Sequence, residues 1–127
     1  MWTKTYIDLL PCDVRGRAYY ARGEAAWPRQ EALFVIDYLA SSHYAVLGGE
    51  IWLATSPGPT IPSPYIYTWE ASPWSHNENW IDFVNRAKAE SERFVREFAW
   101  DPNDKAHLAN TPYFNLTICL ESEYGKH

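Results

Sequence analysis

Glu50 is the residue of this chain whose setting most clearly favours chemistry. It follows two consecutive glycines, Gly48 and Gly49, inside an apolar and β-branched stretch that is typical of a strand. A carboxylate in an interior strand is costly unless a donor meets it. Glu50 therefore either emerges to solvent at a bulge or has a partner such as an Arg side chain, a Trp indole or a backbone N–H.

Glu70 supplies the second carboxylate of a candidate catalytic pair. Glu50 and Glu70 fall in neighbouring strands of the expected sheet, where they could face each other like the acid pair of a glycosidase. The sequence shows no phosphate-binding loop, nucleophile elbow or CxxC motif, and its four His are scattered without ligand spacing. A chain of 127 residues with two thin sheet strands also offers little room for the deep cleft that such a pair needs, so we expect no enzyme, no metal and no cofactor.

Two adjacent elements must position the glycine pair. A helix is predicted over Pro28–Ser41, because Pro suits the first turn and apolar residues recur at three- and four-residue steps. A strand over Tyr44–Ala54 follows, with so little polar surface that both its faces should be covered. The glycines predict an irregular backbone or the close approach of a large side chain, with Trp69 as the favoured neighbour.

The segments flanking this core are read from shorter patterns. Weak helical periodicity over Asp13–Arg22, ended by Gly23, predicts a helix before the central one. Four prolines within residues 56–64 predict an extended connecting loop. Alternation over Tyr65–Glu70 then predicts a strand hairpinned back onto Tyr44–Ala54.

A long helix and a last strand complete the expected fold. Ser75 and Glu78 have the spacing of a capping box, and the helical period continues over Glu78–Ala99. Strict alternation over Tyr113–Glu121 predicts a half-buried strand. We expect the apolar residues of this strand to pack against the long helix. The strand residues are Phe114, Leu116, Ile118 and Leu120, and the helix residues are Val84, Ala87 and Phe94.

These elements predict an α+β fold: a small antiparallel or mixed sheet of three to four strands packed against two to three helices. The length of 127 residues suits a single α+β domain over residues 1–127. A net charge of −5 argues against nucleic acid and favours a basic partner. Aromatic residues reach 17%, more than one small core needs, so a binding face for protein or sugar is expected.

The sequence also indicates a cytoplasmic location. The first residues lack the apolar run of a signal peptide, and no stretch is long enough to span a membrane. Cys12 and Cys119 lie near opposite ends of the chain without metal spacing, which predicts two free thiols.

Three stretches carry a resemblance to a known family. They read WPRQEAL at residues 27–33, AVLGGEIW at residues 45–52 and YTW at residues 67–69. The chain resembles the immunity protein 40 family of bacterial polymorphic-toxin systems. That family's pattern has a Trp before a helix with Ala-Leu, a Leu-Gly-Gly-Asp strand and a Trp shortly after; Glu50 stands in place of its Asp. The resemblance implies a small non-catalytic protein that binds and neutralises a cognate toxin made by the same cell.

A toxin-binding face is expected to combine aromatic anchors with carboxylates that steer a basic toxin. The candidates are Glu50, Tyr65, Tyr67, Trp69, Glu70, Trp74, Asp101 and Asp104. Trp74, which lies outside strand and helix, is the first choice of anchor. Trp27, Gly48 and Gly49 belong to the motif and are expected to be structural.

Two other functions stay open at this point. Surface Trp and Tyr side chains would suit a carbohydrate-binding module, and Glu50 would serve a small hydrolase. Co-purification with the product of a neighbouring gene favours the immunity function, glycan binding favours the module, and loss of turnover in Glu50→Gln favours the hydrolase.

Overall fold

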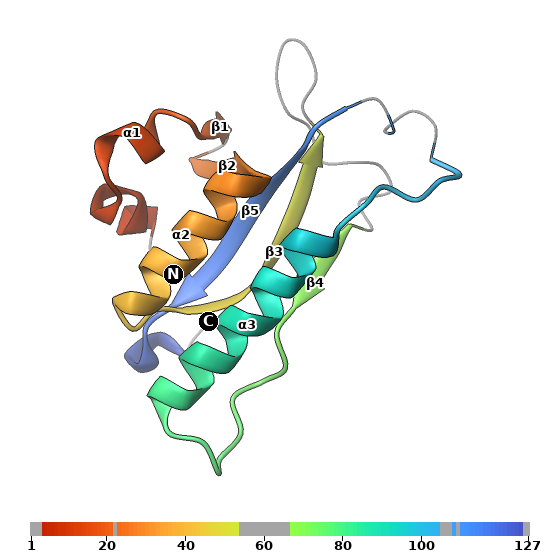
Figure 1. Cartoon of the computed structure of the whole chain (residues 1–127). Helices are drawn as coiled ribbons and strands as arrows, with labels where there is room; N and C mark the ends of the chain where they lie inside the picture. Colours follow the sequence, from red (N-terminus) through yellow and green to blue (C-terminus); the bar gives the residue numbers. More distant parts are fainter. Residues whose placement is uncertain (1–3, 22, 54–66, 105–107, 109, 126–127) are drawn as a thin grey trace.

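An antiparallel sheet forms the centre of the molecule (Figure 1). The computed structural model describes residues 4–21, 23–53, 67–104, 108 and 110–125. Within this part of the chain five strands pair in the order β1-β2-β5-β3-β4. They are β1 (Tyr19–Ala21), β2 (Glu24–Pro28), β3 (Ala45–Leu53), β4 (Thr68–Glu70) and β5 (Pro112–Cys119). The expected α+β class is confirmed, with one strand more than predicted.

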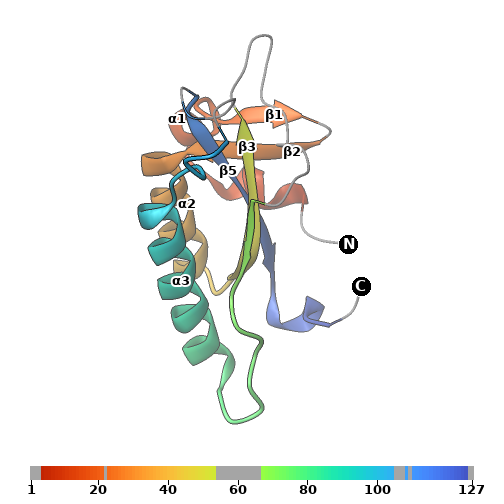
Figure 2. The same ribbon diagram turned by 90° about the vertical axis from the view of Figure 1, so that its right-hand side faces the viewer.

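The helices are distributed unequally over the two faces of the sheet. The described residues form three α-helices and two 3-10 helices, which are α1 (Cys12–Arg15), α2 (Arg29–Ser41), α3 (Trp80–Glu97), η1 (Lys4–Leu9) and η2 (Glu121–Glu123). Figure 2 shows α2 and α3 together on one face, with η1 on the other. Most of that second face is consequently left without a covering helix.

The predicted helix over Asp13–Arg22 is wrong. Only Cys12–Arg15 is helical, and β1 follows and pairs with β2 in a hairpin. Gly23 has φ +77° and lies between the two hairpin strands instead of ending a helix. Tyr19 and Tyr20 favour strands, and their pairing with residues of β2 outweighs the weak helical period.

Trp27 lies in β2, one residue before Pro28, which caps the start of α2. Its indole is fully buried, and its Nε1–H donates to the Val14 carbonyl over 3.2 Å. The predicted central helix and strand are confirmed to within one residue at each end. The prediction that β3 and the strand ending at Glu70 form an antiparallel pair is also confirmed. Residues 55–64 of the expected loop, with Tyr65 and Ile66, lie outside the described residues.

The predicted capping box at Ser75 and Glu78 is misplaced. The N-cap of α3 is Asn79, whose side chain accepts a hydrogen bond from the Asp82 N–H over 2.8 Å. The Glu78 carboxylate does accept from the Ser75 N–H, over 3.0 Å, but in the turn that precedes the helix. The helix therefore begins at Trp80, two residues later than predicted.

Strand β5 lies between β2 and β3 and is more than half-buried, because Asn115 and Cys119 of its expected polar face are buried too. Its alternating apolar residues Phe114, Leu116 and Ile118 join the main core together with Val95 of α3. The prediction that these residues contact Val84 and Ala87 is wrong, because Val84 and Ala87 belong to a second core cluster together with Cys119. Leu120 lies beyond the strand, at the N-cap of η2.

Polar contacts fix the two long helices against each other. The Arg29 guanidinium at the start of α2 donates to the Val95 and Arg96 carbonyls at the end of α3. Lys88 forms an ion pair with Asp37 over 2.7 Å. These contacts join the start of α2 to the end of α3, so the two helices run antiparallel. The Arg29 cation at the end of α3 also complements the dipole of that helix. The two helices thus pack on one face of the sheet and stabilise it, and the opposite face is not covered by them.

Candidate functional site

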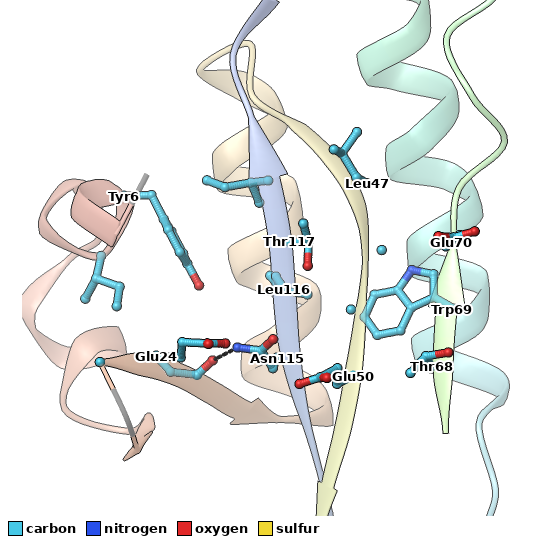
Figure 3. A pocket seen from close by; sticks show the side chains of 16 residues that line it. Tyr6, Glu24, Leu47, Glu50, Thr68, Trp69, Glu70, Asn115, Leu116 and Thr117 are labelled. Atoms are coloured by element: carbon cyan, nitrogen blue, oxygen red, sulfur yellow. Dashed lines mark hydrogen bonds between the residues drawn. The ribbon is translucent and has the colours of Figure 1, made fainter. Parts of the chain in front are cut away.

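A hollow in the described structure lies on the sheet face away from α2 and α3. It is an open concavity of about 860 Å³ over β5 and β3. Figure 3 shows its rims: Tyr6 and Glu24 on one side, and Thr68 and Glu70 on the other. Its floor includes Asn115, Thr117 and the two glycines of β3.

The glycine pair lets three strands approach closely beneath this concavity. The pairing of β3 with β5 shifts register between Val46 and Gly48, as at a β-bulge, and Gly48 has φ +149°. A Cβ at Gly48 would collide with the Trp69 carbonyl oxygen, and a Cβ at Gly49 would lie 2.7 Å from Cη2 of Trp69. The structure thus shows the predicted irregularity, with Trp69 as the large neighbour.

Glu50 has the kind of partner that its interior position requires. Its side chain is half-buried, and Oε1 accepts a long hydrogen bond of 3.4 Å from the Trp52 indole N–H. Glu50 pairs in register with Asn115 on one side and with Thr68 on the other. The structure thus shows elements of both alternatives drawn from the sequence: Glu50 has a Trp indole as donor, and it also follows a bulge and faces the open concavity.

Asn115 is the most buried polar side chain of the concavity, with 5% of its surface exposed. Its Nδ2 donates to the Ala25 carbonyl of β2 over 2.8 Å, which fixes the orientation of the amide. Sequence reasoning placed Asn115 on the polar side of a half-buried strand and assigned it no role. Glu24 was likewise missed, because the β1–β2 hairpin that carries it was not predicted.

Three carboxylates, those of Glu24, Glu50 and Glu70, line the concavity, and no Lys, Arg or His is among its described lining residues. None of the three forms an ion pair with a described residue. Elsewhere carboxylates do have cationic partners: Glu78 and Glu90 bind Arg86, and Asp37 binds Lys88. The concavity is therefore an acidic surface whose charges are not balanced within the described structure.

The aromatic candidates lie away from this surface or beneath it. Trp69 is buried at 8% exposure, stacks on Phe94 with ring centroids 4.8 Å apart and donates from Nε1 to Ser91 Oγ over 3.1 Å. Trp74 is half-buried and packs against Trp80 and Phe83. Tyr65 lies outside the described residues.

A second group of candidates gathers at one end of the sheet. The Tyr67 hydroxyl donates to Asp104 Oδ2 over 2.9 Å and accepts from the Asp101 N–H over 3.4 Å. The carboxylate neighbour contributes to a raised pKa of the Tyr67 hydroxyl, after the larger effect of desolvation. Tyr67 is also held edge-on against Phe98 and Trp100. The structure thus unites Tyr67, Asp101 and Asp104 through hydrogen bonds, and none of them lines the concavity of Glu50 and Glu70.

Most tryptophans serve the core instead of a binding face. Among the described residues, Trp27, Trp52, Trp69, Trp80 and Trp100 are buried. The exposed large rings are Tyr20 and Phe34, on different elements. The surplus of aromatic residues is thus largely absorbed by ring packing, which removes the main support for a sugar-binding surface.

The described residues contain no group of three or more His, Cys, Asp or Glu side chains placed to hold a metal ion. The thiols of Cys12 and Cys119 are both free, as predicted. Burial raises the pKa of the Cys119 thiol to about 12, which makes it a poor nucleophile. Within the described part of the chain, no helix combines the length and apolar character needed to cross a membrane.

Comparison with known proteins supplies the family. The model of the family described as immunity protein 40 matches residues 17–118. The chain belongs to this family. The matched segment begins two residues before β1 and ends one residue before the end of β5. It therefore contains the whole sheet except Cys119, together with α2 and α3. No curated protein and no solved structure gives a significant match.

Proposed function

We propose that this chain is an immunity protein that binds and neutralises the cognate toxin of a bacterial polymorphic-toxin system. The observation that carries the proposal is the family match over residues 17–118, which includes the sheet and both long helices. The toxin would be a protein produced by the same cell, and the chain would inhibit it by binding, without a cofactor or a reaction of its own.

The form of the structure supports a binding role. Two antiparallel helices brace one sheet face (Figure 2). The opposite face carries the open concavity. A binding surface on strands is held more rigidly than one on loops, which reduces the entropy lost on association. The net charge of −5 would speed encounter with a basic toxin.

Co-expression tests this proposal directly. The toxic domain encoded beside this chain is expressed from an inducible promoter in a bacterial host, alone and together with the chain. We expect growth to be arrested by the toxic domain alone and restored by co-expression, and the two purified proteins to elute together from a size-exclusion column. Failure of the wild-type chain both to protect and to bind would overturn the immunity function.

The amount of the chain needed for protection distinguishes an inhibitor that binds the toxin from an enzyme that inactivates it. A binding inhibitor protects in proportion to its amount, so protection should end when the toxic domain exceeds the chain in molar terms. An enzyme that modified the toxin would protect at a small fraction of that amount. Protection at a ratio far below one to one would therefore contradict the binding mechanism.

A further inference from the structure

We infer that the toxin docks on the sheet face away from α2 and α3, through a segment rich in Lys or Arg that enters the concavity between Glu24 and Glu70. This inference rests on the proposed function and adds to it the face and the chemistry of the partner. Figure 3 shows Glu24 and Glu70 on opposite sides of strands β5 and β3, with Glu50 between them.

The charge of the concavity calls for a cationic partner. Its three carboxylates have no described ion-pair partner, whereas the carboxylates of Glu31, Glu78, Glu90 and Glu92 elsewhere are each paired with an Arg. Glu50 and Glu70 lie on the neighbouring strands β3 and β4, where like charges repel each other. A cation placed beside these two carboxylates would relieve that repulsion and gain charge-assisted hydrogen bonds, and a second cation could pair with Glu24 across β5.

The hydrogen-bonding groups of the lining are complementary to Lys and Arg, which carry only donors. The Asn115 side chain is 5% exposed, and its Nδ2 is already occupied by the Ala25 carbonyl. Its Oδ1 receives no hydrogen bond from the residues that the structure describes. The amide oxygen, which is open to the concavity, therefore offers an acceptor beside Glu50, the residue that pairs with Asn115 in the strand register.

The shape of the floor leaves room for a long side chain. The concavity has a volume of about 860 Å³, and Thr117, which pairs in register with Gly48 at its floor, has a short side chain. The glycines also draw β4 close to β3, which brings Glu70 opposite Gly48. A segment with several cationic side chains lying over this floor could thus meet carboxylates from three strands, β2, β3 and β4.

A neutralised variant tests the site with the toxic domain itself. In the triple variant Glu24→Gln, Glu50→Gln, Glu70→Gln we expect affinity for the toxic domain to fall at least tenfold and its salt dependence to flatten. The matched control is Asp13→Asn, Glu97→Gln, Glu121→Gln, which removes the same charge from exposed positions elsewhere. We expect the control to change affinity less than twofold, and both variants to melt near the wild-type temperature.

A cationic peptide tests the same surface without the toxin. Hexa-arginine is titrated into the isotopically labelled wild-type chain, with hexa-glutamine as the neutral reference. We expect the largest amide shifts at Gly48, Glu50, Asn115 and Thr117, and their loss in the triple Gln variant. Shifts centred on the helices, or none, would overturn the inference.

The outcomes separate the site from the function. If the wild-type chain binds the toxic domain and the triple Gln variant and control bind equally well, the docking face is wrong but the immunity function stands. If both variants weaken binding equally, only overall charge matters and the docking face is again wrong. If the wild-type chain does not bind the toxic domain, the immunity function and toxin docking fall together, whatever the peptide shows.

Discussion

The Trp69 indole occupies the space that a side chain at Gly49 would need. A Cβ at position 49 would lie 2.7 Å from Cη2 and 2.9 Å from Cζ3 of that ring, and it would also meet the Asn115 carbonyl oxygen. The ring cannot retreat easily, because it is stacked on Phe94 and bonded to Ser91. The glycine of the family motif is therefore explained by packing alone.

Gly49→Val should consequently destabilise the fold. Overpacking typically costs about 1–3 kcal/mol, and we expect a loss of about 3 kcal/mol because both ring and backbone oppose the side chain. Urea denaturation measures this. The control is Gly16→Ala, where the nearest atom to the added Cβ is 3.5 Å away, and its effect should stay within about 0.5 kcal/mol. Equal effects of the two substitutions would contradict the packing explanation.

Ser91 anchors Trp69 from the side of α3. Its Oγ accepts from the Trp69 Nε1–H over 3.1 Å and donates to the Val46 carbonyl over 3.4 Å, and the residue is fully buried. Ser91→Ala would leave a buried N–H without a partner, at a cost of about 1–3 kcal/mol. Calorimetry on Ser91→Ala, Trp69→Phe and the double variant checks this, since the second loss should be smaller when the first is already present. Strict additivity would mean that the hydrogen bond contributes nothing.

The Glu78–Arg86 pair should make stability depend on pH below about 4.5. Hydrogen bonds from Arg86, at 2.7 and 2.8 Å, and from the Ser75 N–H lower the pKa of Glu78 from 4.5 to about 2. Because the folded pKa is the lower one, this stabilisation is complete above pH 4.5 and is lost as the pH falls toward 2.

Glu78→Gln tests this dependence, because Gln keeps the size of the side chain and removes its charge. In urea denaturation between pH 2 and pH 6, the wild-type chain should gain stability over the variant as the pH rises, until the difference levels off near pH 5. The exposed Glu97→Gln serves as control and should show no such difference. A difference between wild type and Glu78→Gln that is constant over the whole range would rule out the ion pair as its source.

The two thiols should differ sharply in reactivity. Cys12 is exposed, whereas Cys119 is buried and has a pKa raised to about 12. A thiol reagent added to the native chain at pH 8 should therefore modify one equivalent, and two equivalents after denaturation in urea. Cys12→Ser should bring the native count to zero. Rapid labelling of native Cys12→Ser would show that the C-terminal end of β5 opens readily.

The sequence alone determined the elements whose signals are local. The apolar period of residues 28–41, the glycine pair inside a β-branched strand and the long amphipathic run after Glu78 predict α2, β3 and α3 closely. The same local signals supplied the motif of the family. They also left two alternatives for the Glu50 side chain, exposure to solvent at a bulge or a hydrogen-bond partner. Each of these inferences depends on contacts between residues near one another in the chain, where spacing along the sequence fixes geometry.

The tertiary structure decided which residues share a surface. Asn115 bonds to Ala25, 90 residues away in the sequence, and Glu24 reaches the concavity only through a hairpin whose local signal is weak. The same holds for Trp69, because the alternation of a strand does not show whether its ring faces a binding partner or a helix of the same chain. Strand order and burial arise from pairings between distant segments, and the free energy of those pairings depends on every strand and helix around them. For that reason the carboxylates of β2, β3 and β4 meet on one face only in the folded chain.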